Sequence, residues 1–326
     1  MKTKIAGKKW AMPNSFKVFL PALISLVVIS GVTAVFSPSF LTSRNLFNVA
    51  NQATTIAIMG VGATMIIIAG GIDLSCAAAV CLCGLISADL CANLGVSPYL
   101  ALLVSLLIGL VAGLLNGVLV AYVGVVPFIA TMATMNIFRG LCLMYSKSKT
   151  VHSIPDSYTM WGSSKVFGAI PSGIVITLIL YIIGHIVLSK TVFGHKVSAV
   201  GGNREAAKLA GIDTRKTILF TYILAGLCYG IAGILLTGRA GAAYPNAAEG
   251  LELDVIAGCV IGGTAMSGGR GTQIGTWIGV MLVAVISNVI TLLGISAYAT
   301  KLVQGTIILI AVIAELLKNR MQRKRL

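Results

Sequence analysis

Long apolar runs separated by short polar segments dominate the pattern of this sequence. Most of them have about 20 residues, and a helix of that length matches the roughly 30 Å hydrocarbon core of a bilayer. Ten such runs cover residues 18–36, 46–69, 74–93, 98–122, 127–145, 170–189, 217–238, 252–267, 273–293 and 298–317. The pattern predicts an all-α polytopic membrane protein with about ten transmembrane helices.

The eighth run is shorter than the others and ends in a glycine-rich stretch. Five glycines lie near its end: Gly262, Gly263, Gly268, Gly269 and Gly271. A helix broken at membrane depth needs protein or a water-filled cavity to cover its freed backbone groups. We therefore expect a broken or re-entrant helix beside a transport pathway. The alternative is close packing of small residues between helices.

The second half of the chain weakly resembles the first half in the order of its apolar runs and polar residues. Runs two to five and runs seven to ten begin on opposite sides of the membrane. Each quartet contains a Gly-Gly pair (residues 70–71 and 262–263), followed by an asparagine near the end of a later run, Asn116 or Asn288. This internal similarity is consistent with an inverted repeat, whose interface would hold the pathway.

The distribution of positive charge along the chain predicts its orientation in the membrane. The chain has a formal net charge of +15, and most of its 24 Lys and Arg lie in the tails (residues 1–17 and 318–326) and in connections on the same side. Positive residues concentrate on the cytoplasmic side of membrane proteins. We therefore expect both termini in the cytoplasm, residues 18–317 as a lipid-embedded domain, and no nucleic-acid partner.

A polar segment, GGNREAAKLAGIDTRK at residues 201–216, interrupts the apolar pattern on the cytoplasmic side. It predicts a helix of about eight residues over 203–211. Asn203 is its expected N-cap, Glu205 lies in its first turn and Gly211 ends it. Glu205 is expected to pair with Lys208. Its narrow apolar face consists of Ala206, Leu209 and Ala210. So short a helix is not stable alone in water, so it needs a partner.

Polar residues inside the runs are candidates for a translocation path. They are Asn51, Gln52, Asn116, Thr131, Thr134, Asn136 and Asn288. Asp73, in the GGIDLS motif at residues 70–75, either caps the following helix or belongs to a polar turn that lines the path. As a set these residues suit a neutral polar cargo better than an ion. The alternative for each is a hydrogen bond that holds helices together.

Acidic residues gather on the outer side. Glu249, Glu252 and Asp254 are the candidates for docking a protein outside the membrane. The alternative is local ion pairing with Arg139, Arg239 or Lys301.

The sequence contains no catalytic or cofactor motif. There is no GxxxxGK[ST] loop for nucleotide phosphates, the three histidines are scattered, and the seven cysteines lack metal-ligand spacing. We therefore expect no catalytic residues, no metal, no cofactor and no enzymatic activity.

Four motifs in order resemble one family, the membrane permease subunits of ribose-type sugar ABC importers. They are GGIDLS, VPFIATMATMNIFRGL at 126–141, GGNREAAKLAGI at 201–212 and LELDVIAGCVIGGTAMSGGRGTQIGTWIGV at 251–280. The resemblance extends over nearly the whole chain from the second run onward. Members of the family carry ribose, xylose, arabinose, galactosides or autoinducer-2, and more distant relatives carry branched-chain amino acids.

The resemblance implies a sugar permease in the bacterial inner membrane. Its partners would be an ATP-binding subunit, a periplasmic solute-binding protein and a second permease copy, as a homodimer or a heterodimer with a paralogue. The cytoplasmic helix would couple to the ATP-binding subunit through Asn203, Arg204, Glu205, Ala206, Ala207, Lys208, Leu209 and Gly211. Two alternatives do not need this helix: an ion-coupled secondary transporter of a small polar solute, and a passive channel.

Overall fold

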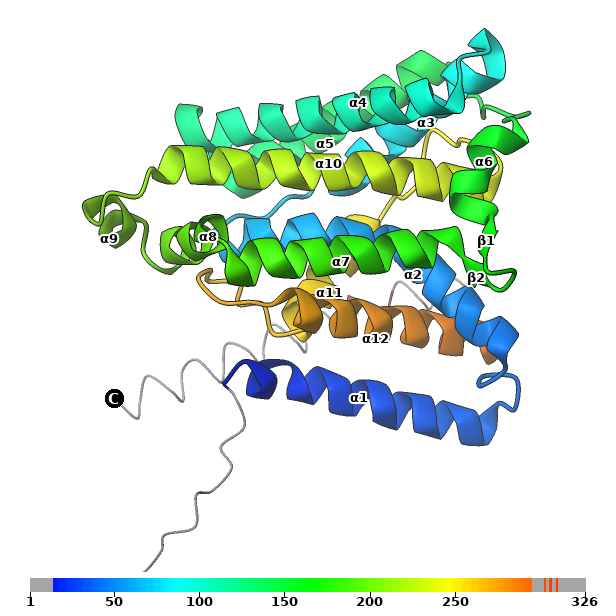
Figure 1. Cartoon of the computed structure of the whole chain (residues 1–326), viewed down its shortest axis with the longest axis horizontal. Coiled ribbons are helices and arrows are strands. Elements are labelled where there is room, and N and C mark those ends of the chain that lie inside the picture. Colours follow the sequence, from blue (N-terminus) through cyan, green and yellow to red (C-terminus); the bar gives the residue numbers. More distant parts are fainter. Residues whose placement is uncertain (1–13, 295–301, 303–304, 307–308, 310–326) are drawn as a thin grey trace, which may run out of the picture.

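Long helices that run side by side build this protein (Figure 1). The computed structural model describes residues 14–294, 302, 305–306 and 309. Eight of the described helices are long and apolar enough to cross a membrane. The fold class expected from the sequence is thus confirmed.

The helices and strands follow one another in this order: α1 (Asn14–Phe36), α2 (Ser43–Ile68), α3 (Cys76–Leu94), α4 (Pro98–Val118) continued by a π-helical turn η1 (Leu119–Val123), α5 (Pro127–Ser146), α6 (Asp156–Ser163), β1 (Lys165–Val166), β2 (Ile170–Pro171), α7 (Ser172–Lys190), α8 (Val192–Gly202), α9 (Arg204–Leu209), α10 (Thr214–Ala240), α11 (Leu251–Ile261) and α12 (Gln273–Leu292). The strands form a small antiparallel hairpin, in which Val166 pairs with Ile170.

Eight of the ten apolar runs correspond to the eight candidate spans. The eighth run, residues 252–267, forms only the 11-residue helix α11 and continues as a non-helical stretch up to α12. At 1.5 Å per residue, α11 is about 16 Å long, roughly half the thickness of the hydrocarbon core. The helix is therefore broken, as expected. Its glycines also pack closely against α12, and a place beside a transport pathway stays a prediction. The tenth run, residues 298–317, lies outside the described residues apart from four positions, and so do residues 1–13 and 318–326. Residues 14–17 of the predicted first tail belong to α1.

Helix α10 lies at the centre of the bundle and packs against α2, α3, α4 and α6. Glycines make its contact with α4 very close: a Cβ atom on Gly109 would lie 2.2 Å from the carbonyl oxygen of Gly226. Such small-residue interfaces are typical of membrane helices, which pack by van der Waals contact because lipid gives no hydrophobic driving force.

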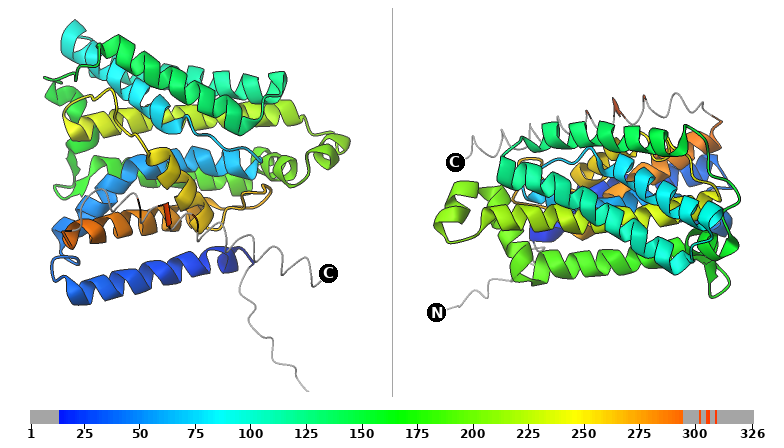
Figure 2. Two further views of the ribbon diagram at one scale, coloured as in Figure 1. Left: turned by 180° about the vertical axis from the view of Figure 1, so that it is seen from behind. Right: turned by 90° about the horizontal axis from the view of Figure 1, so that it is seen from above.

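The two ends of the bundle carry different elements. Helices α8 and α9 lie at one end, and α6 lies with the β-hairpin at the other (Figures 1 and 2). The predicted orientation makes the α9 end cytoplasmic. At the outer end Tyr158 is fully buried, and its hydroxyl lies 2.8 Å from the Ser87 hydroxyl of α3. The outer segment 146–169 is thus folded onto the bundle.

The two Gly-Gly elements end their helices in the same way. After α2, Gly70 has φ +87° and donates its N–H to Ile67; after α11, Gly263 has φ +89° and donates to Val260. Both helices, however, run antiparallel to α12, since Asn45 and Thr64 of α2 contact Asn288 and Thr276. In α11, Gly258 and Gly262 likewise approach Val280 and Gly275. These two elements therefore run in the same direction and do not support an inverted repeat.

Asn288 serves helix packing. Its amide Nδ2 donates to Asn45 Oδ1 at 3.0 Å, and Asn45 Nδ2 donates back to Asn288 Oδ1 at 3.0 Å. This reciprocal pair joins α12 to α2. Asn288 is therefore held by another helix, which favours the packing interpretation over a role in the path.

We expect each single replacement, Asn45→Leu or Asn288→Leu, to lower the free energy of unfolding by about 1–3 kcal/mol, because polar atoms of the other amide lose their partner. In the Asn288 variant the Asn45 side chain keeps, within the described residues, only its bond to the Phe40 carbonyl. The double replacement is expected to cost no more than either single one, since it removes both partners. Thermal unfolding in detergent measures these costs. Additive losses, or a changed KM for cargo in a variant that still folds, would contradict the packing role.

Candidate functional site

Helix α9 has the ends that the sequence predicted. The Asn203 side chain caps it by accepting the N–H of Ala206 at 2.9 Å, and Gly211 follows it with φ +81°. The N–H of Gly211 donates to Lys208 and that of Ile212 to Ala207, the bond pattern of a glycine-ended helix. The helix has six residues, Arg204–Leu209, so it is even shorter than expected.

The apolar face of α9 points away from the bundle. Ala207 is buried, at 5% exposure, whereas Leu209 is 89% exposed, and Ala206 and Ala210 are exposed as well. Arg204, Glu205 and Lys208 are also exposed. The helix is thus anchored through one alanine, and it presents an apolar side chain between charged ones at the surface.

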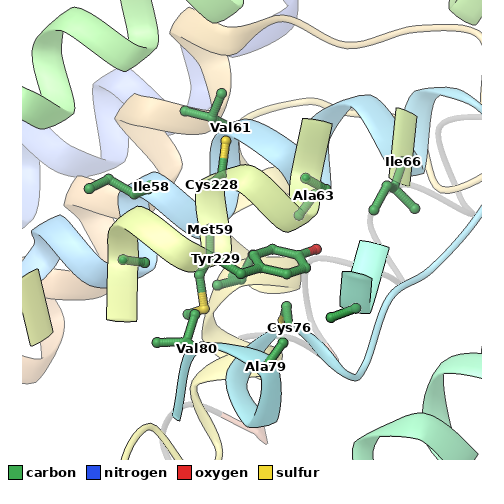
Figure 3. Close-up of a cluster of buried hydrophobic side chains, with 14 of the residues drawn as sticks. Ile58, Met59, Val61, Ala63, Ile66, Cys76, Ala79, Val80, Cys228 and Tyr229 are labelled. Atoms are coloured by element: carbon green, nitrogen blue, oxygen red, sulfur yellow. The ribbon is translucent and has the colours of Figure 1, made fainter. Parts of the chain in front are cut away.

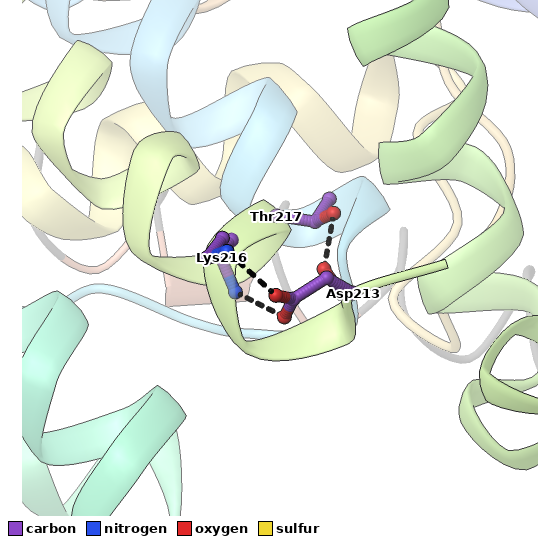
Figure 4. Close-up of polar contacts among 3 residues, drawn as sticks. All are labelled: Asp213, Lys216 and Thr217. Atoms are coloured by element: carbon purple, nitrogen blue, oxygen red, sulfur yellow. Dashed lines mark hydrogen bonds and ion pairs between the residues drawn. The ribbon is translucent and has the colours of Figure 1, made fainter. Parts of the chain in front are cut away.

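The expected Glu205–Lys208 ion pair is not formed between these two described residues. The ion pair found in this segment joins Lys216 Nζ to Asp213 Oδ2 at 3.4 Å, as Figure 4 shows. Asp213 also caps α10 by accepting the N–H of Lys216 at 3.0 Å, and this bond holds the pKa of its carboxyl below the ordinary value. The cap and the ion pair fix the start of α10, directly after α9.

A junction of glycines connects α9 to the bundle. The last turn of α8 contains Gly201, on which a Cβ atom would lie 1.6 Å from the carbonyl oxygen of Ile68 at the end of α2. The same carbonyl accepts the N–H of Gly269 at 2.8 Å. A Cβ atom on Gly268 would lie 2.6 Å from the Gly201 oxygen. The ends of α2 and α8 and the stretch after α11 therefore meet at one point, three residues before α9 begins.

A buried polar network lies deeper in the bundle, around Asp73. Its Oδ2 accepts the Tyr229 hydroxyl at 2.9 Å, and its Oδ1 accepts the Ser75 N–H at 2.8 Å and hydroxyl at 2.6 Å. Asn116 of α4 donates to the Ser75 hydroxyl at 2.7 Å and accepts from Thr134 of α5 at 2.7 Å. The network thus connects α4, α5 and α10 to the segment before α3.

Apolar side chains surround this network. Figure 3 shows the Tyr229 ring between Met59 and Ala63 of α2 and Cys76 and Ala79 of α3. Asp73 itself is only 4% exposed. Asp73 does not cap α3 as predicted, because it bonds to the N–H of Ser75, which precedes the helix, and the Ser75 side chain makes no capping bond.

The candidate path residues fall into separate places. Asp73, Asn116, Thr131 and Thr134 lie together: Thr131 Oγ1 accepts the N–H of Leu74, next to Asp73, at 3.1 Å, and Thr134 bonds to Asn116. The other four lie elsewhere: Asn136 is exposed on α5 and bonds to its own helix at Met132, Asn51 and Gln52 lie on the outer half of α2, and Asn288 pairs with Asn45.

Ser75, Tyr229 and Tyr222 are absent from the sequence-based set of path residues. The Asp-x-Ser spacing of residues 73–75 is typical of a turn in which the aspartate bonds two residues on. Tyr222 and Tyr229 are seven residues apart, which places them on one face of α10. The Asp-x-Ser spacing and the spacing of the two tyrosines are both present in the sequence. Neither spacing shows which distant residue the side chains bond to.

The outer acids do not form one surface. Glu249 is exposed and Glu252 is half-buried, whereas Asp254 is buried at 6% exposure. The prediction of Asp254 as a surface docking residue is therefore wrong for this chain, because α11 starts inside the bundle and carries it inward.

The two outer arginines donate to backbone carbonyls, and Lys301 lies outside the described residues. Arg139 Nη1 donates to the carbonyls of Ala247 at 2.9 Å and Pro245 at 3.3 Å, and Arg239 donates to that of Asn51. The Arg139 bonds connect α5 to the stretch before α11, and the Arg239 bond connects α10 to the outer half of α2.

Within the part of the chain that the structure describes, no three His, Cys, Asp or Glu side chains come close enough to hold a metal ion. The seven cysteines are buried and not in disulfides. The arrangement offers an exposed short helix at one end and a buried hydrogen-bonding network around Asp73.

Comparison with known proteins gives one consistent result. Residues 45–312 match the family described as the permease component of the branched-chain amino acid transport system. The chain is 37% identical to the ribose import permease protein of Bacillus subtilis, over 92% of this chain and 93% of that protein. It is 33% identical to the D-allose transport system permease protein of Escherichia coli K12, over 96% of each. No solved structure matches the chain.

A further relative is the galactose/methyl galactoside import permease protein of Haemophilus influenzae, 33% identical over 90% of this chain and 92% of that protein. All three relatives are transport components and not enzymes, and so is this chain. By this identity and coverage, the chain belongs to the permease family of ribose-type sugar ABC importers.

Proposed function

We propose that this chain forms the path for a monosaccharide in an ATP-driven importer of the bacterial inner membrane. We propose further that α9 couples the conformational change of this chain to ATP hydrolysis by a separate subunit. Relatives named for ribose, D-allose and galactose import support a sugar as cargo. The observation that carries the coupling role is the 89% exposure of Leu209 on a six-residue helix. Together with the exposed Ala206 and Ala210, Leu209 forms an apolar strip beside charged side chains, which suits a groove on another protein.

The proposal includes the partners. A separate ATP-binding subunit contacts α9 and its flanking residues, from Asn203 to Gly211. A periplasmic solute-binding protein delivers the sugar, and a second permease copy, identical or a paralogue, completes the membrane part. The tails, residues 1–17 and 318–326, belong to the cytoplasmic side, and residues 18–317 form the membrane domain.

The test is uptake by proteoliposomes that contain the chain, its ATP-binding subunit and its binding protein. We expect uptake of D-ribose, D-allose or methyl galactoside to require ATP inside and binding protein outside. Uptake by the chain alone along a proton or sodium gradient would overturn the proposal in favour of the secondary transporter.

Glu249 is the remaining exposed acid of the docking set. We expect Glu249→Arg to raise the concentration of binding protein needed for half-maximal uptake by about threefold to tenfold, since reversing a rim charge mainly slows association. Asp156→Arg, at another exposed acid of the outer end, is the control and is expected to change it by less than about twofold. An unchanged response in the Glu249 variant would exclude this acid from the docking surface.

A further inference from the structure

A cavity of about 460 Å³ opens at the α9 end of the bundle. The end of α2, the start of α5, the junction of α8 with α9, helix α10 and the stretch after α11 all contribute to its wall. Its volume lies within the roughly 300–1,000 Å³ that small-molecule sites occupy. Asn203 and Arg204, at the start of α9, are part of its lining.

Tyr222 of α10 lines this cavity with an unsatisfied hydroxyl. The side chain is 2% exposed, and its hydroxyl has no hydrogen-bond partner within the described part of the protein. A Cβ atom on Gly71, another lining residue, would lie 3.0 Å from that hydroxyl. Leaving a buried polar group unpaired is unfavourable. A partner that enters from the cavity beside Gly71 would supply the missing bond.

The cavity lies at the inner end of the buried polar network. Gly71 is two residues from Asp73, and the intervening Ile72 carbonyl accepts a bond from Thr131 at 3.1 Å. Polar groups therefore continue from the Tyr222 hydroxyl at the cavity to Tyr229 and Asn116 deeper in the bundle. This line leads from the interior of the membrane domain to the face that carries α9.

The lining is suited to an uncharged ligand. It contains no carboxylate, and its single charged side chain, Arg204, is exposed at the rim. Five of the lining residues are glycines, which leave backbone polar groups accessible: Gly70, Gly71, Gly124, Gly201 and Gly202. Hydroxyl and backbone groups without compensating charge bind neutral, polyhydroxylated molecules.

We propose that this cavity is an exit site, in which the Tyr222 hydroxyl bonds to the imported monosaccharide before it enters the cytoplasm. The inference rests on the proposed function and adds a second, inward-facing site to it. Because Asn203 caps α9, Arg204 begins it and both line the cavity, movement of α9 changes the shape of this site.

The experiment uses the complete importer in proteoliposomes. The probe is the sugar, among D-ribose, D-allose and methyl galactoside, that the wild-type complex imports. That sugar is loaded inside at increasing concentration, and the initial rate of ATP-driven uptake is measured. We expect internal sugar to slow uptake by the wild-type complex. In Tyr222→Phe the internal concentration for half-inhibition is expected to rise about threefold to tenfold, as for the loss of one hydrogen bond.

Tyr181→Phe is the matched control. Tyr181 of α7 also has a buried hydroxyl without a partner in the described structure, but it does not line the cavity. A second variant, Gly71→Ala, keeps Tyr222 and places a methyl group beside its hydroxyl; it is expected to weaken inhibition as well.

The outcomes separate the two proposals. If the wild-type complex imports none of the sugars, the proposed function fails. If it imports one of them but internal sugar does not slow uptake, or if Tyr222→Phe and Tyr181→Phe shift the half-inhibition equally, the exit site is refuted while the proposed function stands.

Discussion

Replacing Leu209 by glutamate is expected to abolish sugar uptake while the chain still folds and enters the membrane. Leu209 is 89% exposed, so the substitution removes almost no packing inside this chain. Burying a leucine at an interface contributes about 1.5–3 kcal/mol, which corresponds to roughly a 10- to 100-fold change in affinity. Placing a carboxylate in the same apolar groove adds a desolvation cost. Uptake in proteoliposomes and ATP hydrolysis stimulated by the binding protein are the two measurements.

Val192→Glu provides the control for this prediction. Val192 begins α8 at the same end of the bundle and is 70% exposed. It lies outside the segment 203–211, so its replacement is expected to leave uptake within about twofold of the wild type, as for most surface substitutions. If Leu209→Glu and Val192→Glu supported the same uptake, α9 would not be part of the surface that couples to the ATP-binding subunit.

Replacing Gly201 by alanine is expected to prevent stable folding. Its Cβ atom would lie 1.6 Å from the carbonyl oxygen of Ile68, which also accepts the Gly269 N–H. The end of α2 and the stretch after α11 must both move away from α8 to make room. Because alanine is about 1 kcal/mol better than glycine inside a helix, any loss comes from packing. We expect a loss of more than about 4 kcal/mol, in the range of severe core substitutions.

Gly202→Ala is the matched control, one residue further along. At that position the nearest atom to the new methyl group is the Cα of Gly269 at 4.0 Å, an ordinary contact. Size-exclusion profiles and melting temperatures in detergent compare the two variants. A Gly201→Ala variant that melts within a few degrees of the wild type would show that the three-way glycine contact is not needed for folding.

The main elements can be predicted from the sequence because membrane helices have a simple requirement. Each span must be apolar and long enough to cross the bilayer, so the apolar runs locate eight of the helices directly. The caps of α9 were also readable, since Asn203 and Gly211 act on the backbone within a few residues of themselves. Local rules of this kind need no knowledge of the rest of the fold.

Contacts between segments far apart in the chain cannot be predicted from the sequence in the same way. Asp254 stands near the outer end of an apolar run in the sequence, but α11 begins inside the bundle and buries it. Arg139 looks like a partner for a carboxylate, yet its partners are the carbonyls of Pro245 and Ala247, which every residue type offers. The Tyr229–Asp73 bond joins residues 156 positions apart, and no sequence spacing predicts it.

The most direct test of the account is whether an ATP-binding subunit of the importer co-purifies with this chain through α9. The two proteins are co-expressed, and the permease carries either its own α9 or one in which Arg204, Glu205 and Lys208 are replaced by alanine. We predict a stable complex with the wild-type chain, and its loss with the variant although the variant elutes as a folded membrane protein. Equal recovery of the ATP-binding subunit with both chains would contradict the coupling role of α9.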